Sequence, residues 1–109
     1  MCIALPDPIL RYFETDKTQA ADAVAHCFTG AAIVRDERKT YVGRDAILAW
    51  KEQSSRQYRY RVEPLSLTQA DDRLTVTARL TGNFPGSPTN LRYTFMLEDD
   101  QIAYLEIAQ

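Results

Sequence analysis

The chain has 109 residues, of which 45% are hydrophobic and 26% charged, with a net charge of −2 and a pI near 5.3. This length and composition predict one globular domain over residues 1–109 and argue against disorder. The lack of a basic excess argues against a nucleic-acid partner, and no apolar run approaches the roughly 18 residues that would span a membrane. The N-terminus shows no signal peptide, so a cytoplasmic location is expected.

The first helix is expected to begin at Asp7, because Asp is a good N-cap and Pro8 suits the first helical position. Tyr12 and Phe13 then share its apolar face. The polar stretch 15–18 is expected to end this helix.

A second apolar stripe at helical spacing runs from Ala20 to Phe28, and Gly30 is expected to cap the end of its helix. Residues 31–35 and 40–42 predict two short strands. A third helix is expected over residues 44–56.

After this helix the apolar period changes from 3.6 to 2, which indicates strands. Alternating stretches cover residues 58–67, 74–80, 91–97 and 102–107. The alternation changes phase at Pro64, which predicts a bulge that would bend the sheet. Helices followed by long antiparallel strands predict the α+β class, with helices packed into the concave face of a bent sheet. Such a sheet leaves room for a small-ligand cavity.

Asp36 is the strongest candidate for a catalytic residue, because it follows the apolar strand 31–35. A carboxylate that faces an apolar cavity can act as a general base, since burial disfavours its charged form. Tyr12, on the first helix, could be the matching hydrogen-bond donor that stabilises an enolate. This pair predicts carbonyl chemistry on a small apolar molecule. The simpler alternatives are a solvated turn residue for Asp36 and core packing for Tyr12.

The order of elements resembles the nuclear transport factor 2-like superfamily, which includes SnoaL-like polyketide cyclases and ketosteroid isomerases. The resemblance covers nearly the whole chain, and each piece is weak alone but specific in combination. It rests on Arg11 and Tyr12, the helix end Val24 to Phe28, the stretch 32–36, Gly43 to Ile47, and the closing strand 102–107. It implies a single SnoaL-like or ketosteroid isomerase-like domain: a cone-shaped cystatin-like α+β barrel, with a strongly bent, mostly antiparallel sheet and three helices on its concave face.

The resemblance also implies roles for particular residues. Asp36 matches the general base of ketosteroid isomerases and Tyr12 their oxyanion donor, while Tyr93 lies where they have a second donor, a protonated Asp. Trp50 matches an aromatic residue that lines the pocket from the third helix. One departure is Glu37, which follows Asp36 where the isomerases have Pro. Apolar walls are expected from Leu74, Val76, Phe95 and Leu105.

The function implied by the resemblance is binding of a small apolar molecule in a central pocket, with isomerase or cyclase activity. No cofactor or metal is expected, because the substrate's own carbonyl delocalises the charge. A homodimer is expected from the family and from the modest core of a domain of this size. The alternative is a non-catalytic module of the same fold that binds a ligand or a protein. A dehydratase or an epoxide hydrolase would need a His–Asp pair or an Asp–Arg–Asp set, and His26 is poorly placed for the first.

Overall fold

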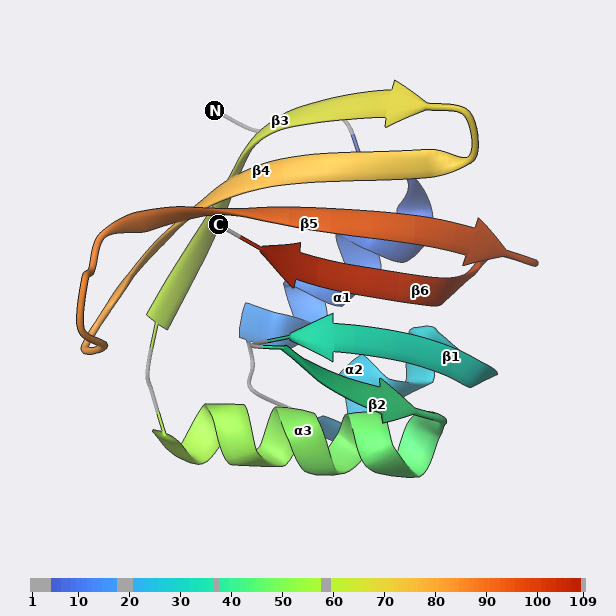
Figure 1. The fold of residues 1–109 in the computed structure, drawn as a ribbon, viewed down its shortest axis with the longest axis horizontal. Helices are drawn as coiled ribbons and strands as arrows, with labels where there is room; N and C mark the ends of the chain where they lie inside the picture. The colour runs from blue at the N-terminus through green and yellow to red at the C-terminus, as the bar shows by residue number, and fades with distance from the viewer. Residues whose placement is uncertain (1–4, 18–20, 37, 58–59, 109) are drawn as a thin grey trace.

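The computed structural model describes residues 5–17, 21–36, 38–57 and 60–108 (Figure 1). These residues form three helices and six strands: α1 (Asp7–Lys17), α2 (Ala21–His26), β1 (Phe28–Asp36), β2 (Lys39–Val42), α3 (Arg44–Gln57), β3 (Tyr60–Ala70), β4 (Arg73–Gly82), β5 (Thr89–Glu98) and β6 (Gln101–Ala108). No helix among them is long and apolar enough to cross a membrane.

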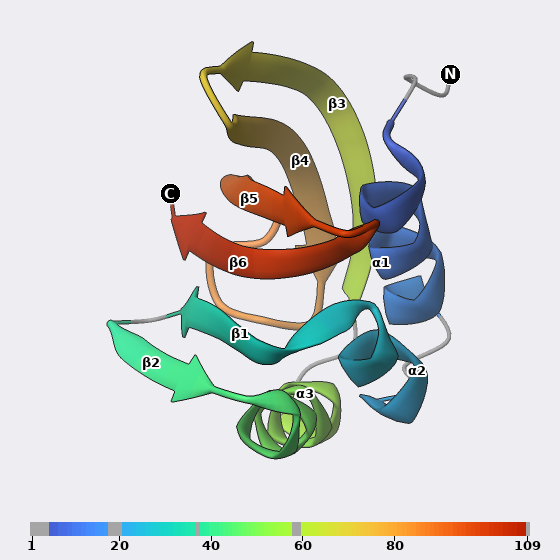
Figure 2. The same ribbon diagram turned by 90° about the vertical axis from the view of Figure 1, so that its right-hand side faces the viewer.

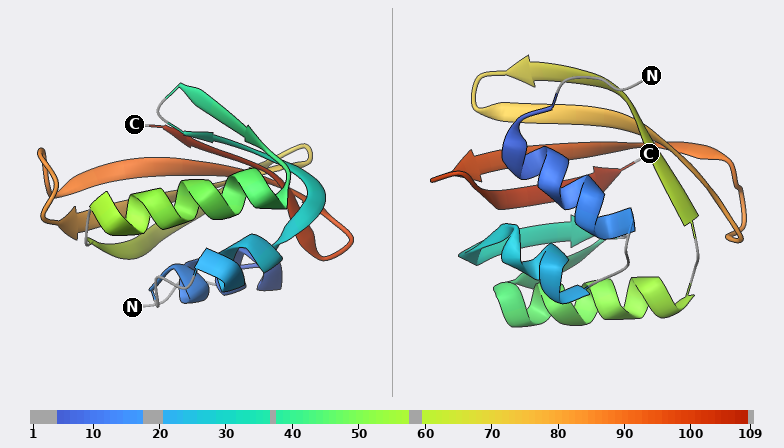
Figure 3. Two further views of the ribbon diagram at one scale, coloured as in Figure 1. Left: turned by 90° about the horizontal axis from the view of Figure 1, so that it is seen from below. Right: turned by 180° about the vertical axis from the view of Figure 1, so that it is seen from behind.

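The strands form one mixed sheet in the order β2-β1-β6-β5-β4-β3. Only β1 and β6 pair in parallel, and the other neighbouring strands are antiparallel. The sheet curls strongly without closing, and the three helices lie along its concave side (Figures 2 and 3). The expected α+β class and bent-sheet architecture are therefore confirmed, with an open sheet in place of a complete barrel.

β3 bends along its length, and the cause can be read from the sequence (Figure 1). Its pairing register with β4 shifts between Pro64 and Ser66, which confirms the bulge expected where the apolar alternation changes phase. Proline has no N–H to donate, so a bulge is one of the few places where a strand tolerates it. The bend carries the outer half of the sheet around the helices.

Two helix boundaries differ from those expected. α2 ends at His26, and Phe28 already belongs to β1, where it pairs with Ile102. Gly30 therefore lies within a strand, so its predicted role as a helix cap is wrong. The helical spacing of the apolar residues is overridden here by tertiary pairing with β6, which local propensity cannot foresee.

α1 runs to Lys17, so it includes Thr15, Asp16 and Lys17 of the polar stretch 15–18 that was expected to end it. The hydroxyl of Thr15 donates to the main-chain oxygen of Arg11 at 2.9 Å, so this polar side chain is satisfied within the helix. The extra turn places Asp16 inside the protein with 7% exposure.

Aromatic side chains from α1 and the sheet fill much of the core. The ring of Tyr12 meets those of Phe13, Phe28 and Phe95 edge-on, with centroid separations of 5.2, 5.9 and 5.7 Å. Edge-to-face contacts of this kind add to the free energy of burial. The cluster fixes α1 on the sheet and, with it, the position of Tyr12.

Candidate functional site

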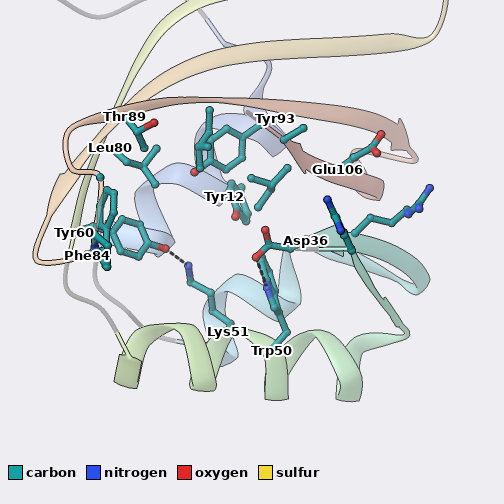
Figure 4. Close-up of a pocket in the computed structure, with 17 residues that line it drawn as sticks. Tyr12, Asp36, Trp50, Lys51, Tyr60, Leu80, Phe84, Thr89, Tyr93 and Glu106 are labelled. Atoms are coloured by element: carbon teal, nitrogen blue, oxygen red, sulfur yellow. Dashed lines mark hydrogen bonds between the residues drawn. The ribbon is translucent and has the colours of Figure 1, made fainter.

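A cavity of about 770 Å³ opens at one end of the curved sheet (Figure 4). Its walls come from α1, α3, the first residue of β3, the end of β4, the loop between β4 and β5, the first half of β5, and the ends of β1 and β6. Four residues expected at a functional site line it: Tyr12, Asp36, Trp50 and Tyr93. Its apolar wall is formed by Leu80, Phe84, Pro85, Leu91 and Ile107.

Asp36 is the last residue of β1, and Trp50 of α3 holds its side chain. The indole Nε1 of Trp50 donates a hydrogen bond of 3.0 Å to Oδ2 of Asp36. Trp50 is itself buried, and its ring packs 6.0 Å from that of Tyr41. The carboxylate is therefore oriented by a rigid donor and is not a freely solvated turn residue. Glu37, where the isomerase pattern differs, lies outside the described residues.

Tyr12 and Tyr93 are nearly inaccessible to solvent, and their ring centroids lie 6.4 Å apart. Burial raises the pKa of Tyr12 well above its usual value, and the nearby Tyr93, Tyr60 and Asp36 raise it further. Burial, Tyr60 and Asp36 likewise raise the pKa of Tyr93. Both phenols therefore stay protonated at neutral pH and can donate hydrogen bonds. Because these groups perturb one another, the polar end of the cavity behaves as one cluster.

A buried ion pair was missed by sequence reasoning. Lys51 of α3 pairs with Asp16 of α1, and their side chains are 2% and 5% exposed. The ammonium of Lys51 also donates to the hydroxyl of Tyr60 at 2.8 Å, and burial lowers the pKa of Lys51 to about 8. The signal was the position of Asp16, one helical turn after Tyr12 on the same face. This position was overlooked because the first helix was expected to end before Asp16.

The expected apolar wall residues lie elsewhere. Val76, Phe95 and Leu105 are fully buried in the core, and Leu74 is half-buried against it. None of the four is among the residues that line the cavity. They support the sheet behind the cavity, while residues nearer the ends of the strands form its surface.

The described residues that line this cavity include no histidine. Among the described residues, no three His, Cys, Asp or Glu side chains cluster in a way that could hold a metal ion. His26, the one histidine of the chain, contacts the main-chain oxygen of Asp22 at 2.8 Å and does not line the cavity.

Comparisons with known proteins agree with the fold. Residues 9–105 match the SnoaL-like domain family. A structure from Sinorhizobium meliloti, provisionally described as a polyketide cyclase, is 40% identical, with 94% of each chain covered and a TM-score of 0.89. A protein from Catenulispora acidiphila with a ketosteroid isomerase-like fold, solved in complex with trimethylamine, is 18% identical over 97% of this chain and 87% of that one, with a TM-score of 0.84.

A third similar structure is SalBIII, described as an epoxide hydrolase/cyclase-like enzyme of pyran ring formation in the polyether salinomycin. It is 19% identical over 93% of this chain and 86% of that one, with a TM-score of 0.75. No curated protein matches the chain. The family match over residues 9–105 and the Sinorhizobium relative together show that the chain belongs to the SnoaL-like domain family.

Proposed function

We propose that this protein is an isomerase or cyclase that acts on an apolar carbonyl compound, with Asp36 as general base. One observation carries the proposal: a carboxylate and two protonated phenols line the same partly apolar cavity. Membership of the SnoaL-like family and similarity to a relative provisionally described as a polyketide cyclase support the same reaction class.

Proton abstraction is the first step of this mechanism. The carboxylate of Asp36 takes a proton from the carbon alpha to the substrate carbonyl, and the C–H electron pair moves onto the carbonyl oxygen. Tyr12 and Tyr93 donate hydrogen bonds to the resulting enolate oxygen. Donors that are fixed before the reaction stabilise developing charge without reorganisation, which makes them effective in a water-poor site.

The fate of the enolate distinguishes the two reaction types. In an isomerase, Asp36 returns the proton to a different carbon of the conjugated enolate. In a cyclase, the enolate carbon forms a bond to a second carbonyl carbon, whose C=O π electrons move onto its oxygen, and Asp36 gives the proton to the resulting alkoxide. In both cases Asp36 gives back the proton that it took, so the enzyme returns to its initial state and no cofactor is needed.

The donor function of the tyrosines depends on their raised pKa. A phenol whose pKa lay near neutrality would ionise beside the ammonium of Lys51 and could no longer donate to an enolate. Burial prevents this for both Tyr12 and Tyr93. The hydrogen bond from Trp50 meanwhile fixes the orientation of the Asp36 carboxylate in the cavity.

Exchange of alpha protons with solvent tests the base without knowledge of the natural substrate. The protein is mixed with 2-tetralone in D₂O, and loss of the alpha-proton signal is followed by NMR. We expect exchange faster than in buffer alone, and Asp36→Asn should reduce the catalysed rate about 10²–10⁴-fold, the usual contribution of a general base. Tyr12→Phe should reduce it by roughly 10²-fold, as for loss of one oxyanion donor.

Tyr104→Phe is the matched control, because it removes a phenol that bonds Glu106 and does not line the cavity. Its exchange rate should equal that of the wild type. Full exchange activity in Asp36→Asn would reject the mechanism. A wild-type protein that binds 2-tetralone without any exchange would favour the alternative, a non-catalytic ligand-binding module of the same fold.

A further inference from the structure

The ion pair between Lys51 and Asp16 stands at the cavity and is used by no step of the mechanism above. Lys51 and Tyr60 both line the cavity, and Figure 4 shows their polar ends directed toward the space that Tyr12 and Asp36 also face. The ammonium lies 5.6 Å from the ring centroid of Trp50 and 5.4 Å from that of Tyr60. Removing two charges from water is costly, so their position beside a ligand cavity calls for an explanation.

The hydroxyl of Tyr60 forms one short and one long hydrogen bond. Its oxygen accepts a bond from the Lys51 ammonium at 2.8 Å, which is short and charge-assisted. Its own O–H donates to Oδ1 of Asp16 at 3.4 Å, well beyond the usual separation of about 2.7–2.8 Å for such bonds. The hydroxyl is therefore polarised on its acceptor side and poorly used on its donor side. A substrate oxygen in the cavity would offer it a better partner.

Tyr60 also belongs to the same polar cluster as the candidate catalytic residues. Burial and Asp36 raise its pKa to about 12, so it is a neutral donor at physiological pH. Tyr60 in turn raises the pKa of Tyr12 and of Tyr93, which places the three hydroxyl groups within electrostatic reach of one another. Two of these phenols are assigned to the reacting carbonyl, which leaves the third for a different oxygen.

We propose that Tyr60, held by Lys51, binds a second oxygen of the substrate, so that the cavity is built for dicarbonyl compounds in preference to simple ketones. Tyr60 is the residue that contacts the substrate, and Lys51 is a positioning residue that acts through it. The proposal rests on the proposed function only in taking this cavity as the substrate site, and it requires no turnover.

A matched pair of compounds measures the contribution of the second carbonyl oxygen to binding. The diketone 2,2-dimethylindane-1,3-dione and the monoketone 2,2-dimethylindan-1-one differ by one carbonyl in place of a methylene. Neither has a hydrogen on carbon alpha to a carbonyl, so neither can form an enolate or be consumed. We expect calorimetric titration of the wild type to show roughly tenfold tighter binding of the diketone, the effect of one hydrogen bond of about 1.4 kcal/mol.

Tyr60→Phe should abolish this preference by weakening diketone binding about tenfold, with monoketone binding unchanged. Tyr104→Phe is the control for loss of a phenol outside the cavity lining and should keep the preference. Lys51 is tested in the double variant Asp16→Asn, Lys51→Met, which removes both charges and leaves no unpaired ion. This variant should fold and should retain only part of the preference.

A pH profile distinguishes positioning by Lys51 from a merely structural role. The ammonium of Lys51 pairs with Asp16 of α1 and bonds Tyr60 of β3. The other titratable or charged groups that line the same cavity are Tyr12, Arg35, Asp36, Arg38, Tyr93 and Glu106. The tyrosines remain protonated in this range, whereas Lys51 loses its proton above about pH 8. The neutral amine then accepts a hydrogen bond from the Tyr60 hydroxyl, so that this hydroxyl no longer donates to the ligand. The diketone preference of the wild type should therefore fall as the pH rises through about 8, and the double variant should show no such step.

The step should persist in Asp36→Asn, which identifies Lys51 and not Asp36 as its origin. Equal binding of the two compounds by the wild type, binding of neither, or an unchanged preference in Tyr60→Phe would each overturn the proposal. These outcomes are independent of the proton-exchange test. A protein without exchange activity can still show the Tyr60-dependent preference, and an active enzyme can lack it.

Discussion

The buried pair of Lys51 and Asp16 makes a clear prediction for stability at the scale of single residues. Lys51→Met leaves the carboxylate of Asp16 buried without its counter-ion, which typically costs about 3–5 kcal/mol. The free energy of unfolding, measured in urea, should fall by this amount. The double variant Asp16→Asn, Lys51→Met should recover most of the loss, because no unpaired charge remains. A double variant as unstable as the single one would show that the pair acts through packing and not through charge.

The sequence predicts which face of each strand is buried but not which buried residues line the cavity. Alternation along β4 and β5 predicts correctly which side chains point toward the helices, including Val76 and Tyr93. It gives no information on how far along the strand the helices extend. Val76 and Phe95 lie in the core only, whereas Leu80 and Tyr93 belong to the core cluster and also line the cavity. Whether an inner-face residue is covered by a helix depends on tertiary packing, which strand alternation does not report. The residues that were expected to form the cavity wall are therefore found in the core.

Gly43 makes a prediction at the scale of elements, because it joins β2 to α3. It has a φ of +88°, in the left-handed region, and its N–H bonds the main-chain oxygen of Ala32 at 2.9 Å. This turn sets where α3 begins and hence where Trp50 and Lys51 stand. Gly43→Ala should destabilise the protein by about 1–2 kcal/mol, because a Cβ disfavours that φ, although the nearest atom would be at an ordinary 3.7 Å. Thermal unfolding followed by circular dichroism measures the change.

Gly30 is the matched control, since it lies in β1 without a positive φ and a Cβ there would meet nothing within 4 Å. Gly30→Ala should leave the stability unchanged or slightly raise it, because the unfolded chain loses freedom. Equal destabilisation by both substitutions would mean that backbone conformation at Gly43 is not the cause.

The end of α1 explains why part of the site was missed. Composition alone suggested that the polar stretch 15–18 breaks the first helix, but Thr15 forms its hydrogen bonds inside it. The additional turn delivers Asp16 to Lys51, across a sequence separation that no local pattern spans. Long-range ion pairs of this kind are invisible to periodicity, whereas the bulge at Pro64 has a purely local cause and was predictable.

At the scale of the whole molecule, the aromatic cluster of the core and the polar groups of the cavity lie at different places along the curved open sheet. The aromatic cluster around Tyr12 and Phe95 packs between α1 and the sheet, while the polar groups meet at the end where β1 and β6 finish. Tyr12 belongs to both regions, with its ring in the core and its hydroxyl grouped with the cavity phenols. A fold of this size can thus hold a ligand cavity without opening its core.

The free energy of unfolding at alkaline pH depends on every group whose pKa differs between the folded and unfolded chains. The direction in which each group changes this free energy with pH follows from linkage. Lys51 has a folded pKa of about 8 against an ordinary value of 10.5, so between these values the unfolded chain binds the proton that the folded chain has released. That difference makes the free energy of unfolding rise with pH, by at most about 1.4 kcal/mol per pH unit. Cys27 and the buried tyrosines act in the opposite direction, since their raised pKa values mean that the unfolded chain releases protons first.

Comparison of two proteins isolates the contribution of Lys51 from this sum. Wild type and the double variant Asp16→Asn, Lys51→Met share the cysteine and the tyrosines, so their opposing effect cancels in the difference. The stability of the wild type relative to the variant should increase steadily from pH 8 to 10.5 in urea unfolding. A flat difference would mean that the ammonium keeps its ordinary affinity for the proton, because attraction to Asp16 offsets burial. In that case the decline of diketone preference near pH 8 should also be absent, which links the two experiments through one titrating group.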